Sequence, residues 1–199
     1  MAETADQMYA RITSSGERLP APGFVDWPTF PLEADAGDVI VRDLPAPAAE
    51  EPRKGESNLP CPICAPPQDV IWQDDAWRVK PHPERSGLPL VLFLESHEHL
   101  DFHELDEDQA ADMGRLSVRV ARIVESIDGI GRCHVMRFGD GCSHVHVWFL
   151  ARPAGLGALR GSFAQLWDDS LPPGPEDVWR ADLATVARKL ATHGGEALV

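Results

Sequence analysis

The chain has 199 residues, of which 43% are hydrophobic, and its net charge is −14. This length can bury one sizeable core and leaves room for extensions. The acidic balance argues against a nucleic-acid groove, which needs clustered Lys and Arg, and against an anionic membrane surface, although a local pocket can still hold a nucleotide. No apolar run reaches the length of a membrane span and no signal peptide is recognisable, so we expect a cytoplasmic protein with reduced thiols.

The N-terminal part, residues 1–58, is expected to be an extension and linker. A short helix is expected within residues 5–18, and a short strand at residues 38–42. Residues 20–31 are rich in proline and aromatic side chains, which excludes a long regular element but indicates an arm that packs down on the domain. Residues 45–58 combine Pro, Ala and charge, as a linker does.

A central domain is expected over residues 59–152. Its strands are expected at 69–73, 76–80, 88–94, 132–138 and 144–150, and a long helix at 106–127. Asp106 is placed as the N-cap of that helix, and apolar residues at helical spacing predict its buried stripe. The fold class expected is therefore α+β, with a mainly antiparallel five-stranded sheet and one long helix between strands three and four.

The C-terminal part, residues 153–199, is expected to be an extension whose helix packs on the domain. The helix is predicted at residues 176–192, with Pro175 at its start. Before it, Phe163, Leu166 and Trp167 are expected to cover the sheet.

The stretch 139–150 is the most informative part of the chain. A Gly-Asp-Gly turn precedes a strand in which Val145, Val147 and Phe149 alternate with His144, His146 and Trp148. Alternation places the two histidines and the tryptophan on the face opposite the core. The plain alternative is a pair of half-exposed histidines at a sheet edge, but neither a core nor a solvated face needs two imidazoles at this spacing.

The motif Cys61-Pro-Ile-Cys64 has the short spacing of a zinc site. A pair of buried cysteines and a redox pair are the alternatives. The redox interpretation is weakened because Pro66-Pro67 follows in place of a helix whose N-terminus would lower a thiol pKa. A closed zinc site needs two further ligands, and the candidate sources are His97, His99, His103 and His144.

The sequence His144-Val-His146-Val-Trp148-Phe-Leu resembles the His-φ-His-φ-His-φ-φ signature of the histidine triad (HIT) superfamily, where φ is an apolar residue. The resemblance covers roughly residues 61–152 and implies a HIT-like fold. It also implies a structural zinc ion held by Cys61, Cys64, His99 and His144, as in the branch of galactose-1-phosphate uridylyltransferase. That branch likewise lacks the third histidine, which is Trp148 here.

The resemblance further implies a nucleotidyl hydrolase or transferase. His146 matches the histidine that attacks the α-phosphorus of a nucleoside phosphate ester, anhydride or phosphoramidate and forms a nucleotidyl-histidine. Arg137 and the backbone around Gly141, Cys142 and Ser143 are expected to bind the phosphoryl oxygens. Trp148 can donate one N–H or stack on a ring, but it cannot serve as a general acid. The resemblance also suggests a homodimer.

Two other functions remain open at this stage. The same fold can hold a nucleotide or nucleotide-sugar without turnover, with Trp148 as a stacking platform. A zinc-stabilised domain can also recruit a protein through its surface and its N-terminal arm. The presence of the middle histidine favours the enzyme, because a binding protein needs no nucleophile.

Overall fold

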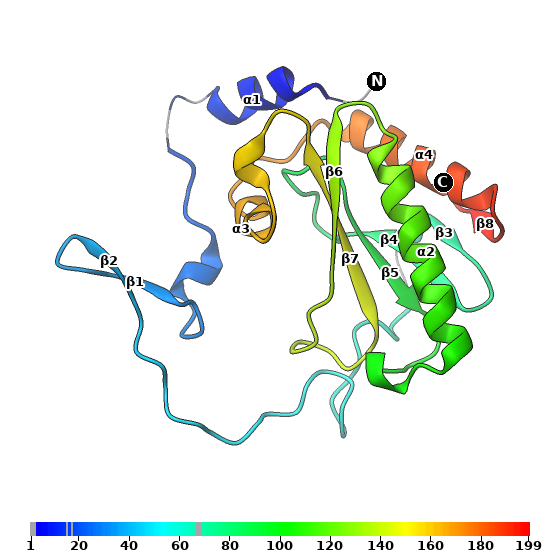
Figure 1. Cartoon of the computed structure of the whole chain (residues 1–199), viewed down its shortest axis with the longest axis horizontal. Helices are drawn as coiled ribbons and strands as arrows, with labels where there is room; N and C mark the ends of the chain where they lie inside the picture. The colour runs from blue at the N-terminus through cyan, green and yellow to red at the C-terminus, as the bar shows by residue number, and fades with distance from the viewer. Residues whose placement is uncertain (1–2, 15, 17, 67–68) are drawn as a thin grey trace.

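The computed structural model describes residues 3–14, 16, 18–66 and 69–199. A six-stranded antiparallel sheet with the order β6-β7-β5-β4-β3-β8 lies at its centre (Figure 1). The strands are β3 (Trp72–Gln73), β4 (Trp77–Pro81), β5 (Val91–Ser96), β6 (Ile130–Met136), β7 (His146–Pro153) and β8 (Glu196–Ala197). The helices are α1 (Ala5–Thr13), α2 (Glu107–Glu125), α3 (Phe163–Asp168) and α4 (Glu176–Ala191), with 3-10 turns at Gly23–Asp26, Phe102–Glu104 and Gly157–Leu159.

The α+β class and the antiparallel sheet are confirmed, and α2 joins the third and fourth strands as expected. The prediction of five strands is wrong, because β8 pairs with β3 as a sixth. Gly194 and Gly195 adopt φ values of +121° and +71°, which glycine tolerates, and return the chain from α4 to the sheet edge. A two-residue strand carries no periodic pattern, so the sequence gives no sign of it.

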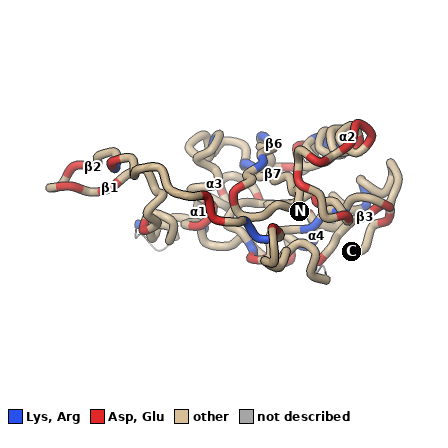
Figure 2. Tube along the Cα trace, turned by 90° about the horizontal axis from the view of Figure 1, so that it is seen from below, with Lys and Arg blue, Asp and Glu red and all other residues tan. Residues whose placement is uncertain are grey.

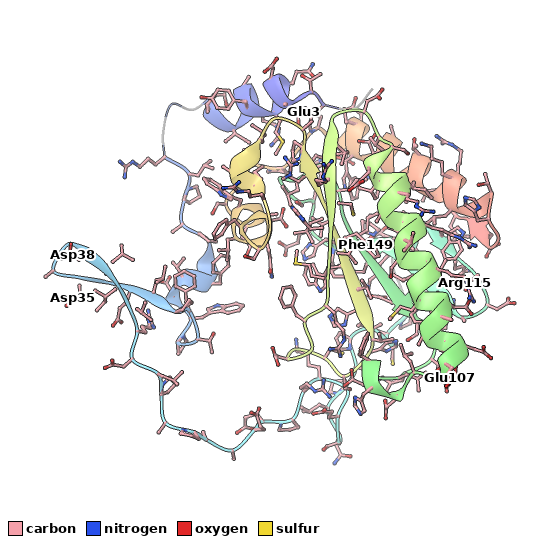
Figure 3. The ribbon with its side chains drawn as sticks, in the orientation of Figure 1. Glu3, Asp35, Asp38, Glu107, Arg115 and Phe149 are labelled. Atoms are coloured by element: carbon pink, nitrogen blue, oxygen red, sulfur yellow. The ribbon has the colours of Figure 1, made fainter. Side chains whose placement is uncertain are left out.

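One face of the sheet is covered by α2 and α4. Asp106 caps α2 in a capping box with Gln109, and the buried stripe of the helix includes Leu116 and Val120. Phe149 of β7, labelled in Figure 3, is 1% exposed and belongs to the same core. Each large apolar side chain buried in this way contributes about 1.5–3 kcal/mol to folding. The core therefore fixes which face of β7 is turned away from it.

The opposite face carries a second apolar cluster at one end. Met8 of α1 and Ala164 of α3 pack there against Val91 and Leu150, two neighbouring positions of β5 and β7. His146 lies on the same face of β7, four residues before Leu150. It is not part of the cluster that α1 and α3 form with the sheet. The nucleophile expected from the sequence is thus outside this apolar cluster, and its side chain is half-buried.

The large side chains of α3 that were expected to cover the sheet do not cover it. Phe163, Leu166 and Trp167 are 56%, 40% and 38% exposed, and the small Ala164 is the residue that packs inward. The large side chains of this short helix instead line an apolar groove together with Phe24 and other residues of the N-terminal arm.

The N-terminal arm contains a hairpin where a single strand was expected. Strands β1 (Leu32–Asp35) and β2 (Asp38–Val41) pair with each other, and all their residues are exposed. The hairpin stands away from the sheet, with acidic positions near its turn (Figures 1 and 2). Trp27, which was expected to help the arm pack down, is 62% exposed. Among the described residues, none of the helices combines the length and the apolar character that crossing a membrane requires.

Candidate metal centre and active site

Four side chains from three separate segments meet at one end of the sheet. Cys61 and Cys64 come from the segment before β3, His99 follows β5, and His144 immediately precedes β7. The four possible ligand atoms lie within 4.8 Å of one another. This is the ligand set that the resemblance implied.

The ring of His144 is oriented by the protein for ligation. His144 is fully buried, and its Nε2 lies 2.9 Å from the carbonyl oxygen of Ser96. A proton on Nε2 that donates to this carbonyl leaves the lone pair of Nδ1 directed at the Sγ atoms of Cys61 and Cys64, at 3.5 and 3.4 Å. Burial lowers the pKa of His144, which keeps the imidazole in the neutral form that a metal requires.

His99 completes the cluster from the solvent side. Its Nδ1 lies 3.1 Å from the Sγ of Cys64, and its Nε2 is 3.5 Å from the hydroxyl of Ser143. Gly55 lies directly over this pair, and a Cβ atom there would come within 2.8 Å of both side chains. The close approach of the linker backbone therefore depends on a glycine at position 55.

The donor set and its spacing fit a zinc ion. Two thiols and two imidazoles are a common tetrahedral set, and bonds of about 2.0–2.3 Å place neighbouring ligand atoms about 3.3–3.8 Å apart. The three sulfur–nitrogen distances of 3.1, 3.4 and 3.5 Å are close to this range. Soft sulfur with imidazole disfavours calcium and magnesium, which prefer oxygen ligands. The site is thus compatible with zinc.

Cys142 lies beside the cluster without joining the four. Its Sγ is 3.8 Å from that of Cys61, the side chain is 6% exposed, and burial raises the pKa of its thiol. A buried neutral thiol packs like a small apolar side chain. Cys142 was expected among the substrate-binding residues, and its side chain is turned toward the metal cluster.

His146 is half-buried and begins strand β7. His144 lies before the strand, so the two histidines do not form the simple row on one strand that the alternation predicted. The Nδ1 of His146 is 2.7 Å from the carbonyl oxygen of His144. When Nδ1–H donates to that carbonyl, Nε2 carries the lone pair, and this is the tautomer that a nucleophilic imidazole needs.

Trp148 lies next to His146 on the same face, as alternation along β7 predicts. Its ring packs edge-on against Phe93 with the ring centres 4.4 Å apart, and Phe138 is 6.3 Å away. The indole Nε1 is buried and has no hydrogen-bond partner among the described residues. The side chain thus fills the place beside His146 as an apolar group.

Two of the three remaining residues expected to bind phosphate, Ser143 and Arg137, already have partners. The amide of Ser143 donates to the carbonyl of Lys54 at 2.9 Å, and Arg137 donates to the carboxylate of Asp101 at 2.6 Å. Arg137 also lines a cavity of about 620 Å³ with Asp101 and Gly139. Gly141 is exposed and open space surrounds it. An anion could be met by Gly141 directly, whereas Ser143 and Arg137 would have to exchange partners.

A group of charged residues on the face of His146 was not expected from the sequence. Glu95 pairs directly with His146 across β5 and β7, is 2% exposed, and forms ion pairs with Arg78 at 3.0 Å and Lys80 at 2.9 Å. In β4, Arg78 and Lys80 alternate with apolar residues, and this alternation in the sequence could have indicated two cations on one face of the sheet. Their proximity to His146 depends on the register of three strands, which the sequence does not display.

No protein-family model matches this sequence, and no curated protein shows significant similarity to it. Solved structures are similar in fold. A zinc-bound histidine triad family protein from Mycobacterium smegmatis superposes with a TM-score of 0.51 at 18% identity, covering 67% of this chain and 96% of the other. A histidine triad protein from Bradyrhizobium japonicum gives 0.48 at 18% identity over 60% and 88%. A histidine triad nucleotide-binding protein from Sulfolobus tokodaii gives 0.46 at 12% over 63% and 86%.

The structural similarity is to histidine triad proteins over almost the whole length of the Mycobacterium smegmatis chain. At 18% identity it establishes the fold, while the chemistry depends on the residues of this chain. The sheet, the long helix between its third and fourth strands and the histidine segment before and in β7 together form the histidine triad fold.

Proposed function

We propose that this protein is a nucleotidyl hydrolase or transferase that acts on nucleoside phosphate esters, anhydrides or phosphoramidates through a nucleotidyl-histidine on His146. The observation that carries the proposal is the 2.7 Å contact between Nδ1 of His146 and the carbonyl of His144. It selects the tautomer in which Nε2 is the nucleophile, and the half-buried position limits the motion of the ring.

The reaction has two displacements at phosphorus. Nε2 attacks the α-phosphorus, the bond to the leaving group breaks, and the leaving group takes the bonding electron pair. Water or an acceptor hydroxyl then attacks the same phosphorus and releases its proton to the solvent, the P–N bond breaks, and the imidazole regains its lone pair. Zinc has a structural role in this proposal: the metal centre holds the segments around His144, and with them the carbonyl that orients His146.

Intact-protein mass spectrometry is the test of this function. After mixing with nucleoside phosphoramidates, dinucleoside polyphosphates or nucleotide-sugars, the wild-type protein is expected to gain the mass of one nucleotidyl group. The gain should be lost completely in His146→Ala, because the nucleotidyl group is proposed to form on this imidazole. A protein with His103→Ala, a loop histidine whose side chain is 76% exposed, is the matched control and should form the adduct normally.

A nucleotide-binding role without turnover is the second candidate, and Trp148 is the observation that favours it. An indole cannot protonate a leaving group, and the loss of a general acid typically costs about 10²–10⁴ in rate. Tight nucleotide binding without any adduct or product in the same experiment would establish this alternative in place of the enzyme.

We also propose a cytoplasmic homodimer, assembled through the edge strand β6 and the adjoining α2. Val135 of β6 and Val118 of α2 are 46% and 49% exposed, and β6 has an unpaired edge. Light scattering at micromolar concentration is expected to give twice the mass of the chain, and Val135→Lys should shift the protein toward monomer. A wild-type monomer across this concentration range would contradict the dimer.

A further inference from the structure

We infer that Lys80 binds the leaving group of the substrate and that this group is itself a phosphate. The preferred substrates are then nucleoside 5′-diphosphate or polyphosphate conjugates, and phosphoramidates, which release an amine, are poor ones. This inference rests on the proposed function and identifies the substrate class within it.

The position of Lys80 follows from the register of the sheet. Lys80 of β4 pairs with Phe93 of β5, and Phe93 pairs with Trp148 of β7. All three side chains therefore lie on the face that carries His146. The centre of the Phe93 ring is 6.0 Å from Nζ of Lys80 and 6.4 Å from the ring centre of His146. The ammonium and the nucleophile thus lie on either side of one aromatic ring.

The charges in this group do not cancel. Arg78 and Lys80 share the single carboxylate of Glu95, so the three side chains carry a net charge of +1 beside His146. Arg78 is 5% exposed and also donates to the carbonyl of Ile63, next to the metal-binding cysteines. The side chain of Lys80 is 17% exposed, and among the described residues Glu95 is the only carboxylate that forms an ion pair with its ammonium. Lys80 therefore retains donors for a substrate anion.

Lys80 reaches the strand position next to His146. Glu95 of β5 is the direct cross-strand partner of His146 in β7, and its carboxylate lies 2.9 Å from Nζ of Lys80. A phosphate that departs from the phosphorus attacked by His146 would therefore leave close to this ammonium, which can donate a charged hydrogen bond to it.

The chemistry of Trp148 leads to the same substrate class. When the P–O bond to a phosphate leaving group breaks, the electron pair stays on that oxygen and no proton is required. An amine leaving group must be protonated as the P–N bond of the substrate breaks, and Trp148 has no proton to give. A cation stabilises a departing phosphate without supplying a proton, and Lys80 is such a cation.

The test compares leaving groups on one nucleoside. Rates of adduct formation are measured for diadenosine triphosphate against adenosine 5′-phosphoramidate, and for UDP-glucose against uridine 5′-phosphoramidate. The wild-type protein is expected to react faster with the phosphate-releasing member of at least one pair. Lys80→Met should slow that reaction about 10- to 100-fold, the range for loss of a charged hydrogen bond, and change the phosphoramidate rate less than threefold.

Three controls keep the result interpretable. Lys189→Met removes the same charge from the surface of α4, where Lys189 contacts Ser126, and should change neither rate. Lys80→Arg keeps the charge and should retain most of the preference. Lys80→Met leaves Glu95 paired with Arg78, so its zinc content should match wild type; if it does not, Lys80→Gln takes its place.

The possible failures are distinct. Equal slowing of both substrates by Lys80→Met, no slowing of either, or a wild-type preference for phosphoramidates would overturn the role of Lys80 and leave the nucleotidyl-histidine intact. The absence of any adduct on wild-type protein with all four compounds would overturn the proposed function, and this inference with it.

Discussion

Cys61→Ser is expected to reduce bound zinc from about one ion per chain to well below one, and to destabilise the protein severely. The Sγ of Cys61 lies 3.5 Å from Nδ1 of His144, and the metal would join a segment before β3 to the chain entering β7. Loss of a structural metal costs more than about 4 kcal/mol, which corresponds to a fall in melting temperature of roughly 8–16 °C for a chain of this length. Metal analysis and calorimetry measure the two effects.

The third nearby sulfur provides the matched control. Cys142→Ser makes the same chemical change 3.8 Å from the sulfur of Cys61, and it should leave zinc at one per chain with only a small loss of stability. Full zinc in Cys61→Ser would refute the ligand assignment. Loss of zinc in Cys142→Ser would show that Cys142 is a ligand in place of one of the four.

The central fold was predictable because its signals are local. Asp106 directly precedes α2, and the apolar residues of the helix recur at helical spacing. The N-cap and the buried stripe were therefore both placed correctly from the sequence. Val147 and Phe149 of β7 alternate with the residues on the other face, and both lie in the core together with Val145, which precedes the strand. Strand β8 and the hairpin of the arm were not predicted. Each of these short strands is defined by its pairing with another strand, and its own short sequence does not identify that strand.

The site was predictable only in part, because its geometry comes from contacts distant in sequence. The orientation of the His144 ring is fixed by the backbone carbonyl of Ser96, which is 48 residues away in the sequence. Two histidine ligands were chosen from four by resemblance, since spacing alone did not distinguish them. The placement of Lys80 near His146 depends on the register of β4, β5 and β7. The sequence of β4 alone shows that Lys80 alternates with apolar residues, but it does not show that His146 is nearby.

Trp148→His is expected to raise the rate of adduct formation with phosphoramidates by at least about 10-fold. A well-placed general acid typically accelerates a reaction by about 10²–10⁴-fold, and we expect the variant to recover part of this acceleration. Position 148 is next to His146 on the same face of β7, and an imidazolium there can protonate a departing amine. The rate with a phosphate leaving group should change much less, because Lys80 stabilises that group without a proton. The preference between the two substrate classes is therefore expected to narrow or reverse.

Trp148→Phe is the control that distinguishes the effect of a proton donor at position 148 from the effect of a smaller side chain there. Both variants give up the contact between Trp148 and Phe93, whose ring centres are 4.4 Å apart, and both should lower the melting temperature by several degrees because a half-buried aromatic group becomes smaller. Only the histidine can donate a proton, so only it should gain rate with an amine leaving group, and the gain should decline as pH rises and the imidazole loses its charge. Equal rates for the two variants would mean that room beside His146, and not a missing acid, limits the reaction.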